Sequence, residues 1–97
     1  MSNTITITLQ DTVRQSGGTV VSDMDGEKVM LSIENGKYYN LGDIGGDIWA
    51  LMEQSATVRS MLDTLLDKYN VDPAECEAHL LAFLRQLLQE GLIRVGE

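Results

Sequence analysis

The stretch Lys37 to Met52, KYYNLGDIGGDIWALM, decides the fold because two structural periods meet in it. Residues 37–41 combine two tyrosines with a leucine, a composition typical of a short β-strand. After Gly42 the apolar residues recur at helical spacing, at Ile44, Ile48, Leu51 and Met52, with Trp49 beside them. The pattern predicts a strand that passes directly into a helix at about 43–53. Gly45 and Gly46 lack a Cβ, so this helix can approach the sheet closely.

Two β-prone runs precede this stretch, TVVSDM at 19–24 and KVMLSI at 28–33. Asp25-Gly26 separates them, and Asn35-Gly36 separates the second run from residues 37–41. Asp-Gly and Asn-Gly are the dipeptides that two-residue hairpin turns favour. The sequence therefore predicts an antiparallel meander of three strands, with the last strand at an edge.

The first eighteen residues are expected to be an accessory strand or a flexible lead-in. Residues 4–9, TITITL, alternate threonine with isoleucine or leucine, which is the pattern of a strand with one buried face. QSGG at 15–18 is typical of a flexible connection. The whole chain, 1–97, has the length of a single domain.

Two further helices follow the junction. Ser55 or Thr57 can cap the second helix, whose apolar positions are Val58, Met61, Leu62, Leu65, Leu66 and Tyr69. The third helix has a strong start signal in Asp72-Pro73-Ala74-Glu75 and is expected to end near Gly91. LIRV at 92–95 can then form a brief terminal strand. The fold class is α+β, a three-stranded antiparallel sheet followed by a three-helix bundle of winged-helix-like character.

Composition argues against several classes of function. Seven basic and fifteen acidic residues leave a net charge of −8, which disfavours nucleic acid as a partner. No apolar run approaches the roughly 20 residues of a membrane span, so we expect a cytoplasmic protein that does not enter the membrane. The single cysteine, Cys76, excludes an internal disulfide and a Cys-rich zinc site, and we expect no metal and no cofactor.

Catalytic residues are not evident either. His79 has no second histidine at metal-ligand spacing and no nucleophile placed by the pattern, and Cys76 is typical of a buried packing residue. Gly42, Gly45 and Gly46 lack the spacing of a phosphate-binding loop. We therefore expect that the protein is not an enzyme.

The junction Tyr39 to Trp49, YNLGDIGGDIW, resembles that of the PqqD-like proteins, also called RiPP precursor-peptide recognition elements. The similarity spans about residues 19–95 and rests on the order of further matches, at Thr57-Val58, Tyr69, Val71, Phe83-Leu84, Leu87 and Gly91-Leu92-Ile93. Many members place asparagine where this chain has Gly42, so the helix cap is expected at Gly42 or Asp43.

The resemblance implies a protein that binds the leader segment of a ribosomally made precursor peptide. It is most like the discrete recognition proteins of lasso peptide biosynthesis, which deliver the precursor to a separate cysteine protease and an ATP-dependent cyclase. Two alternatives stay open: a PqqD-type peptide chaperone that partners a radical enzyme in cofactor biosynthesis, and a generic peptide-binding adaptor. A winged-helix DNA binder is disfavoured, because the third helix offers only Arg85, Gln86 and Gln89 among acidic residues.

The resemblance also implies where the leader binds: as an added strand beside residues 37–41, in a groove between that strand and the third helix. An edge strand has unpaired N–H and C=O groups that a peptide strand can satisfy. Tyr38 and Tyr39 point to opposite faces, and the sequence leaves open which of them borders the groove. The candidate peptide-binding residues are Lys37, Tyr38, Tyr39, Asn40, Leu41, Leu80, Leu81, Leu84 and Arg85.

Overall fold

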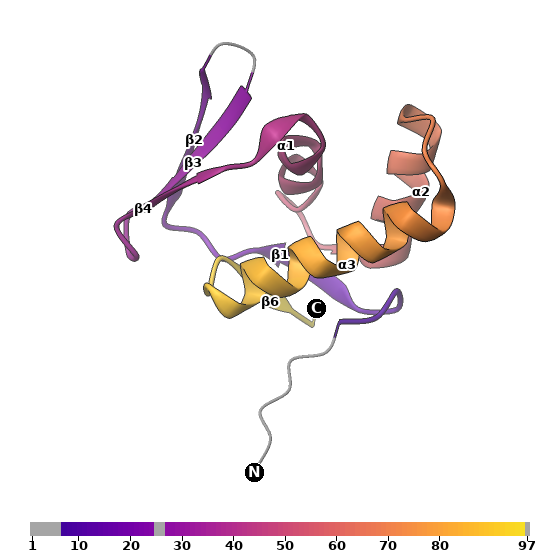
Figure 1. Ribbon diagram of the computed structural model, residues 1–97. Helices are drawn as coiled ribbons and strands as arrows, with labels where there is room; N and C mark the ends of the chain where they lie inside the picture. Colours follow the sequence, from indigo (N-terminus) through magenta and orange to yellow (C-terminus); the bar gives the residue numbers. More distant parts are fainter. Residues whose placement is uncertain (1–6, 25–26, 97) are drawn as a thin grey trace.

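The computed structural model describes residues 7–24 and 27–96 (Figure 1). Within them the chain forms two three-stranded sheets and three α-helices. The elements in chain order are β1 (Thr12–Gln15), β2 (Thr19–Met24), β3 (Glu27–Ser32), β4 (Lys37–Asn40), α1 (Gly42–Leu51), β5 (Ala56–Thr57), α2 (Val58–Lys68), α3 (Pro73–Gln89) and β6 (Ile93–Val95). The predicted α+β class is confirmed.

The first sheet is the predicted antiparallel meander, in the order β2-β3-β4. Its turn at Asn35-Gly36 is held by the Gly36 N–H, which donates to the Ser32 carbonyl at 2.8 Å. Gly36 has a φ of 65°, a conformation that glycine adopts without strain. The asparagine-glycine signal in the sequence therefore marked a real hairpin. The other predicted turn, Asp25-Gly26, lies outside the described residues.

A second sheet, in the order β5-β1-β6, corrects the expectation for the first eighteen residues. Positions 4–6 of the expected strand lie outside the described residues, and residues 7–9 are not in a strand. The strand is instead β1, which includes part of the stretch expected to be flexible, and its Val13 is fully buried. Val13 pairs with Ala56 on one side and Val95 on the other. These partners are distant in sequence, so TVRQ alone carries little signal of a central strand. The predicted terminal strand is confirmed as β6.

Helix boundaries follow the capping signals for α2 and α3. Thr57 Oγ1 accepts from the Ser60 N–H at 3.2 Å, and Asp72 Oδ2 accepts from the Glu75 N–H at 3.0 Å. At the start of α1 the expected cap was wrong in detail. Leu41 occupies the N-cap position and makes no side-chain capping bond. The Gly42 N–H donates instead to Asn40 Oδ1 at 3.1 Å. Gly42 has a φ of 70°, which lets the strand turn sharply into the helix.

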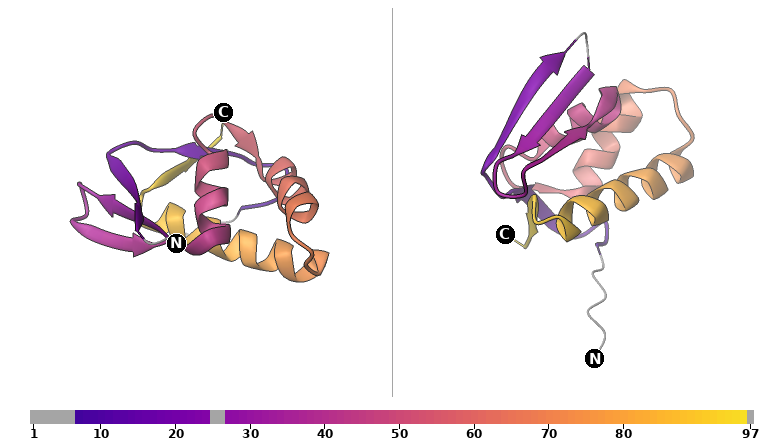
Figure 2. Two further views of the ribbon diagram at one scale, coloured as in Figure 1. Left: turned by 90° about the horizontal axis from the view of Figure 1, so that it is seen from above. Right: turned by 60° about the vertical axis from the view of Figure 1, so that its left-hand side comes forward.

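Helix α1 lies on one face of the first sheet, and α3 crosses below α1 in the view of Figure 1 (see also Figure 2). The expected close approach of α1 to the sheet is confirmed at Gly46, where an added Cβ would lie 2.4 Å from Lys28 Cγ. The core beneath α1 includes Met30 of β3 and Leu80 and Leu84 of α3. This packing leaves β4 as the last strand of its sheet, on the side of α3.

Candidate functional site

Within residues 7–24 and 27–96, strand β4 pairs only with β3, so its other edge is free and has defined hydrogen-bonding positions. The Leu41 N–H donates to the Lys28 carbonyl of β3 at 2.8 Å, and Tyr39 pairs opposite Met30. Backbone groups of an antiparallel strand alternate in direction from one residue to the next. Tyr39 and Leu41 therefore use their backbone groups toward β3, whereas Tyr38 and Asn40 direct theirs to the open edge.

The two tyrosines of β4 lie on opposite faces of the sheet, as predicted, and the structure assigns each to its face. Tyr39 is half-buried toward the core, and its hydroxyl donates to Glu90 Oε1 at 2.8 Å. Tyr38 is 75% exposed on the outer face. Lys37 is also exposed, with Nζ 3.8 Å from Glu90 Oε1. Tyr39 is thus the tyrosine on the side of α3.

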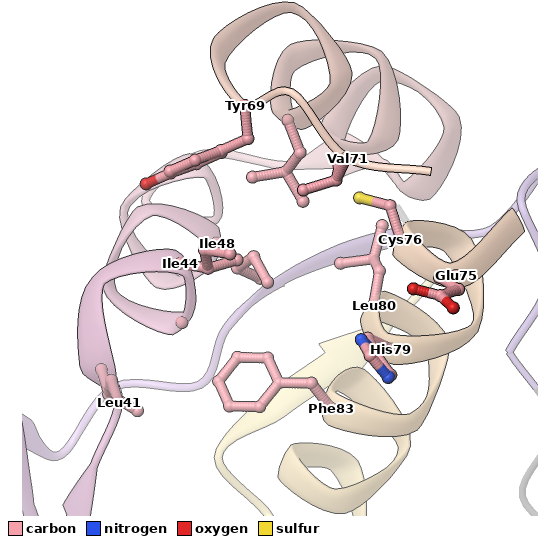
Figure 3. A pocket seen from close by; sticks show the side chains of 12 residues that line it. Leu41, Ile44, Ile48, Tyr69, Val71, Glu75, Cys76, His79, Leu80 and Phe83 are labelled. Carbon is pink, nitrogen blue, oxygen red and sulfur yellow. The ribbon is translucent and has the colours of Figure 1, made fainter. Parts of the chain in front are cut away.

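A pocket of about 400 Å³ opens next to the end of β4, between α1, the end of α2 and the first half of α3 (Figure 3). Leu41 and Phe83 lie at one end of it, Tyr69 and Val71 lie at the other, and Ile44 and Ile48 of α1 face Leu80 of α3 across it. Most of this lining is aliphatic or aromatic, so the pocket suits an apolar side chain. Because Leu41 directly follows β4, a strand paired to the free edge would lead into the pocket.

Polar groups just outside the pocket lining hold Tyr69, which is itself part of the lining. The Tyr69 hydroxyl donates a hydrogen bond to Asp47 Oδ2, and Lys68 Nζ lies 2.9 Å from the same oxygen. These hydrogen bonds, from Lys68 first and then Tyr69, lower the pKa of Asp47 below its usual value of 3.8. Asp47 is therefore a carboxylate at neutral pH, and the phenol of Tyr69 is a proton donor to it.

The remaining polar lining comes from α3, as Glu75, Cys76 and His79. Burial raises the pKa of the Cys76 thiol, which is therefore protonated and weakly nucleophilic at neutral pH. Over residues 7–24 and 27–96, no three His, Cys, Asp or Glu side chains gather closely enough to hold a metal ion. The arrangement provides a binding surface of apolar walls beside an unpaired strand edge.

The predicted site residues divide among four places. Lys37, Tyr38, Tyr39 and Asn40 form the edge strand, and Leu41 and Leu80 line the pocket. Leu84 is fully buried in the core. Leu81 and Arg85 lie apart from the pocket, in a shallow depression that also includes Ala74, Glu77 and Ala78.

The separation on α3 follows from helical geometry. Cys76, Leu80 and Phe83 are spaced by three or four residues and share one stripe, whereas Leu81 is rotated by about 100° from Leu80. Sequence reasoning missed the α1 side of the pocket and its far end, formed by Ile44, Ile48, Tyr69 and Val71. Only the structure identifies Ile44 as a pocket residue, because there this apolar helix residue is 43% exposed.

In the part of the chain that the structure describes, no helix combines the length and apolar character needed to cross a membrane.

Comparisons with known proteins agree with this fold. The chain is similar to the solved structure titled "TbiB1 in Complex with the TbiA(beta) Leader Peptide", at 31% identity over 84% of this chain and 94% of that one, with a TM-score of 0.73. A structure titled "Lasso peptide synthetase B1 complexed with the leader peptide" shares the fold at 21% identity, covering 84% and 96% of the two chains with a TM-score of 0.72.

The third solved structure is the PqqD truncation of Methylobacterium extorquens PqqCD, described as a stand-alone RiPP recognition element. It has a TM-score of 0.75 and 24% identity, over 91% of this chain and 94% of that one. No curated protein matches. The family described as "Coenzyme PQQ synthesis protein D (PqqD)" matches residues 27–93, which include the edge strand, the junction and all three helices. The resemblance inferred from the sequence is thus confirmed, and the chain belongs to the PqqD family.

Proposed function

We propose that this protein binds the leader segment of a ribosomally synthesised precursor peptide, as a strand added to β4 with an apolar leader side chain in the pocket. The observation that carries this proposal is the position of the pocket at the end of an unpaired strand edge. Outward N–H and C=O groups of Tyr38 and Asn40 would pair with the leader backbone. The two similar structures that contain leader peptides support the same ligand class.

The leader is that of a lasso peptide precursor, and the protein delivers it to a separate leader protease and a cyclase. The lasso pathway is supported by the structure titled "Lasso peptide synthetase B1 complexed with the leader peptide", and the structure similar at 31% identity supports a leader peptide as the ligand. Reaction chemistry lies in the partner enzymes, and this protein supplies recognition without catalysis. Its net charge of −8 would attract a basic leader, an effect that salt weakens.

The outer face of the first sheet is a surface on which such an enzyme can dock. Val20 is 49% exposed and Tyr38 75%, on the face opposite α1, and Ile33 in the turn after β3 is 67% exposed. Exposed apolar residues that gather on one face favour protein contacts. A leader strand added to β4 would extend this face, so an enzyme docked there would contact protein and leader together.

The alternative is a PqqD-type chaperone that presents its peptide to a radical enzyme in cofactor biosynthesis, for which the family description is the supporting observation. Both functions use the same edge and pocket. They differ in the peptide bound and in the enzyme that receives it, so competition between the two classes of peptide separates them.

Titration with a fluorescent synthetic leader, from the precursor encoded beside this gene, tests the proposal. A scrambled leader is the control, and each titration is run at two salt concentrations. We expect saturable, micromolar binding of the true leader alone, the order of magnitude of a small one-strand contact. Failure of the folded protein to bind the true leader would refute the proposal.

Proline substitution identifies the strand edge. Tyr38→Pro removes an N–H that points to the open edge, whereas Tyr38→Ala keeps that N–H and removes only the side chain. We expect Tyr38→Pro to lower leader affinity by about tenfold relative to Tyr38→Ala, because at least one main-chain hydrogen bond is lost. Equal affinities in the two variants would exclude strand addition at this edge.

A further inference from the structure

Tyr69 belongs to no helix or strand, and its N–H donates to the Leu65 carbonyl in the last turn of α2 at 2.8 Å. It directly follows α2 with extended backbone angles, φ −117° and ψ 144°, and it begins the connection to α3. Its ring and Val71 form the end of the pocket farthest from β4 (Figure 3). The size of the pocket at this end therefore depends on what holds the Tyr69 side chain.

One carboxylate holds it. Asp47 lies on α1 next to the pocket residue Ile48, and its Oδ2 accepts the hydrogen bond from the Tyr69 hydroxyl. Lys68 Nζ lies 2.9 Å from the same oxygen and 5.7 Å from the centroid of the Tyr69 ring. The end of α2 is thus joined to α1 by a single acceptor that pairs with two consecutive residues.

We propose that Asp47 is a positioning residue for leader recognition: by holding the Tyr69 ring, it sets the size of the apolar leader side chain that the pocket admits. The proposal rests on the proposed function, because it assumes that the pocket receives a leader side chain. Asp47 itself lies outside the lining and acts through Tyr69.

The charges around Asp47 favour a lasting contact. Lys68 and Lys28 are the cations near this carboxylate, and Asp43 lies in the same shallow depression with Tyr69. Asp47 is ionised at neutral pH, and hydrogen bonds to a charged acceptor are stronger than those between neutral groups. The ring of Tyr69 is therefore fixed in the free protein, before any peptide binds.

Loss of the hydroxyl or of the carboxylate would leave the ring held only by its packing against the core, and therefore less firmly positioned. The connection between α2 and α3 would then move more widely, and the far end of the pocket would accept larger side chains. A pocket with a fixed wall discriminates between side chains that differ by one methylene group, with affinities that differ by about 10-fold to 200-fold. A mobile wall would reduce that ratio of affinities.

Cys76 gives a readout at this end of the pocket that needs no peptide. It is the single cysteine of the chain, it lines the pocket, and Figure 3 shows it beside Val71. We expect Tyr69→Phe and Asp47→Ala, which each remove the hydrogen bond, to raise the rate of Cys76 alkylation by iodoacetamide about fivefold, the ratio that corresponds to one lost hydrogen bond. Asp43→Ala is the matched control, since it removes the same side chain from the same helix without breaking the bond to Tyr69.

The second readout is leader preference. An alanine scan of the synthetic leader first identifies the position that needs an apolar side chain, and that position is then varied through Ala, Val, Leu and Phe. In the wild type we expect one size to be preferred. In Tyr69→Phe and Asp47→Ala we expect the ratio of affinities between the best side chain and the next larger one to fall at least threefold, with Asp43→Ala unchanged. Circular dichroism checks that each variant is folded.

The outcomes separate the two proposals. If the wild type binds no leader, the proposed function fails, and a role for Asp47 in recognition fails with it. If the wild type binds the leader but both variants keep the wild-type size preference, the positioning role is refuted while the proposed function stands. An unchanged rate of Cys76 alkylation in both variants would likewise refute it.

Discussion

The hydroxyl of Tyr39 donates to Glu90 Oε1 at 2.8 Å, which joins the edge strand β4 to the end of α3. The backbone carbonyl of Glu90 accepts from Asn35 Nδ2 at 3.0 Å, so the preceding turn is held to the same residue. The first bond connects residues that are 51 positions apart in the chain, and the second connects residues that are 55 positions apart. One end of β4 is attached to α3 in this way, and the other end leads to the pocket.

Removing this connection should weaken both stability and binding. We expect Tyr39→Phe to lower the free energy of unfolding by about 1 kcal/mol, the usual net value of one hydrogen bond, as measured by urea denaturation. Leader affinity should fall as well, because β4 would be less well positioned. Tyr38→Phe is the control, since that side chain is 75% exposed, and an equal loss of stability in both variants would contradict the assignment.

The neighbouring glycines of α1 should respond differently to alanine. In Gly46→Ala the new Cβ would lie 2.4 Å from Lys28 Cγ and 3.1 Å from Lys28 Cβ, so the Lys28 side chain must move and β3 must shift slightly from the helix. We expect a loss of about 1–3 kcal/mol in unfolding free energy. In Gly45→Ala the nearest atoms, Leu41 Cβ and Phe83 Cζ, lie at 3.4 Å.

Gly45→Ala should therefore leave stability nearly unchanged, helped by the better helix propensity of alanine. It should still weaken leader binding, because Gly45 lines the pocket and the added methyl group narrows it. Thermal unfolding and leader titration on the same two samples measure both effects. Wild-type leader affinity in Gly45→Ala would argue against the pocket as the leader site.

Alkylation of Cys76 should show the pH dependence of a buried thiol. Burial raises its pKa above the ordinary value of 9.0, so the reactive thiolate forms at higher pH in the folded protein than in an unfolded chain. In the folded protein we expect the alkylation rate to keep rising at pH values above the titration midpoint of the Cys76 thiol measured in urea. Bound leader should slow the reaction at every pH, and a scrambled peptide should not.

Asp47 should contribute to stability only while it is ionised. Its pKa is lowered in the folded state, so its contribution is present above the unfolded value of about 3.8 and is lost as pH falls through the lower folded value. We expect Asp47→Asn to cost about 1 kcal/mol at pH 7, a modest figure for a partly exposed carboxylate. The difference from the wild type should shrink below about pH 3.8 in denaturant titrations. A difference that is constant down to pH 2 would contradict this account.

Strand β1 should be part of the core rather than an appendage. Val13 is fully buried between β5 and β6, and we expect Val13→Ala to lower the free energy of unfolding by about 2 kcal/mol. Val20→Ala provides the control, because Val20 is 49% exposed. A loss below about 0.5 kcal/mol for Val13→Ala, as for ordinary surface positions, would show that β1 is dispensable.

The local signals of the sequence determined the meander, the helix starts and the α+β class. Asn35-Gly36, Thr57 and the Asp72-Pro73 pair each act within a few residues of themselves, through turn geometry and capping bonds that need no distant partner. The same holds for the alternation that places Tyr38 and Tyr39 on opposite faces.

Only the tertiary structure decided which face of β4 is turned toward α3 and where the pocket lies. Tyr39 faces α3 because Glu90 is there to accept its hydrogen bond, and Val13 is central because β5 and β6 arrive from distant parts of the chain. Leu80 lines the pocket while Leu81 does not, because the angle at which α3 packs selects one of two apolar stripes. Each of these outcomes depends on contacts between residues far apart in sequence, and local propensity carries no information about such contacts.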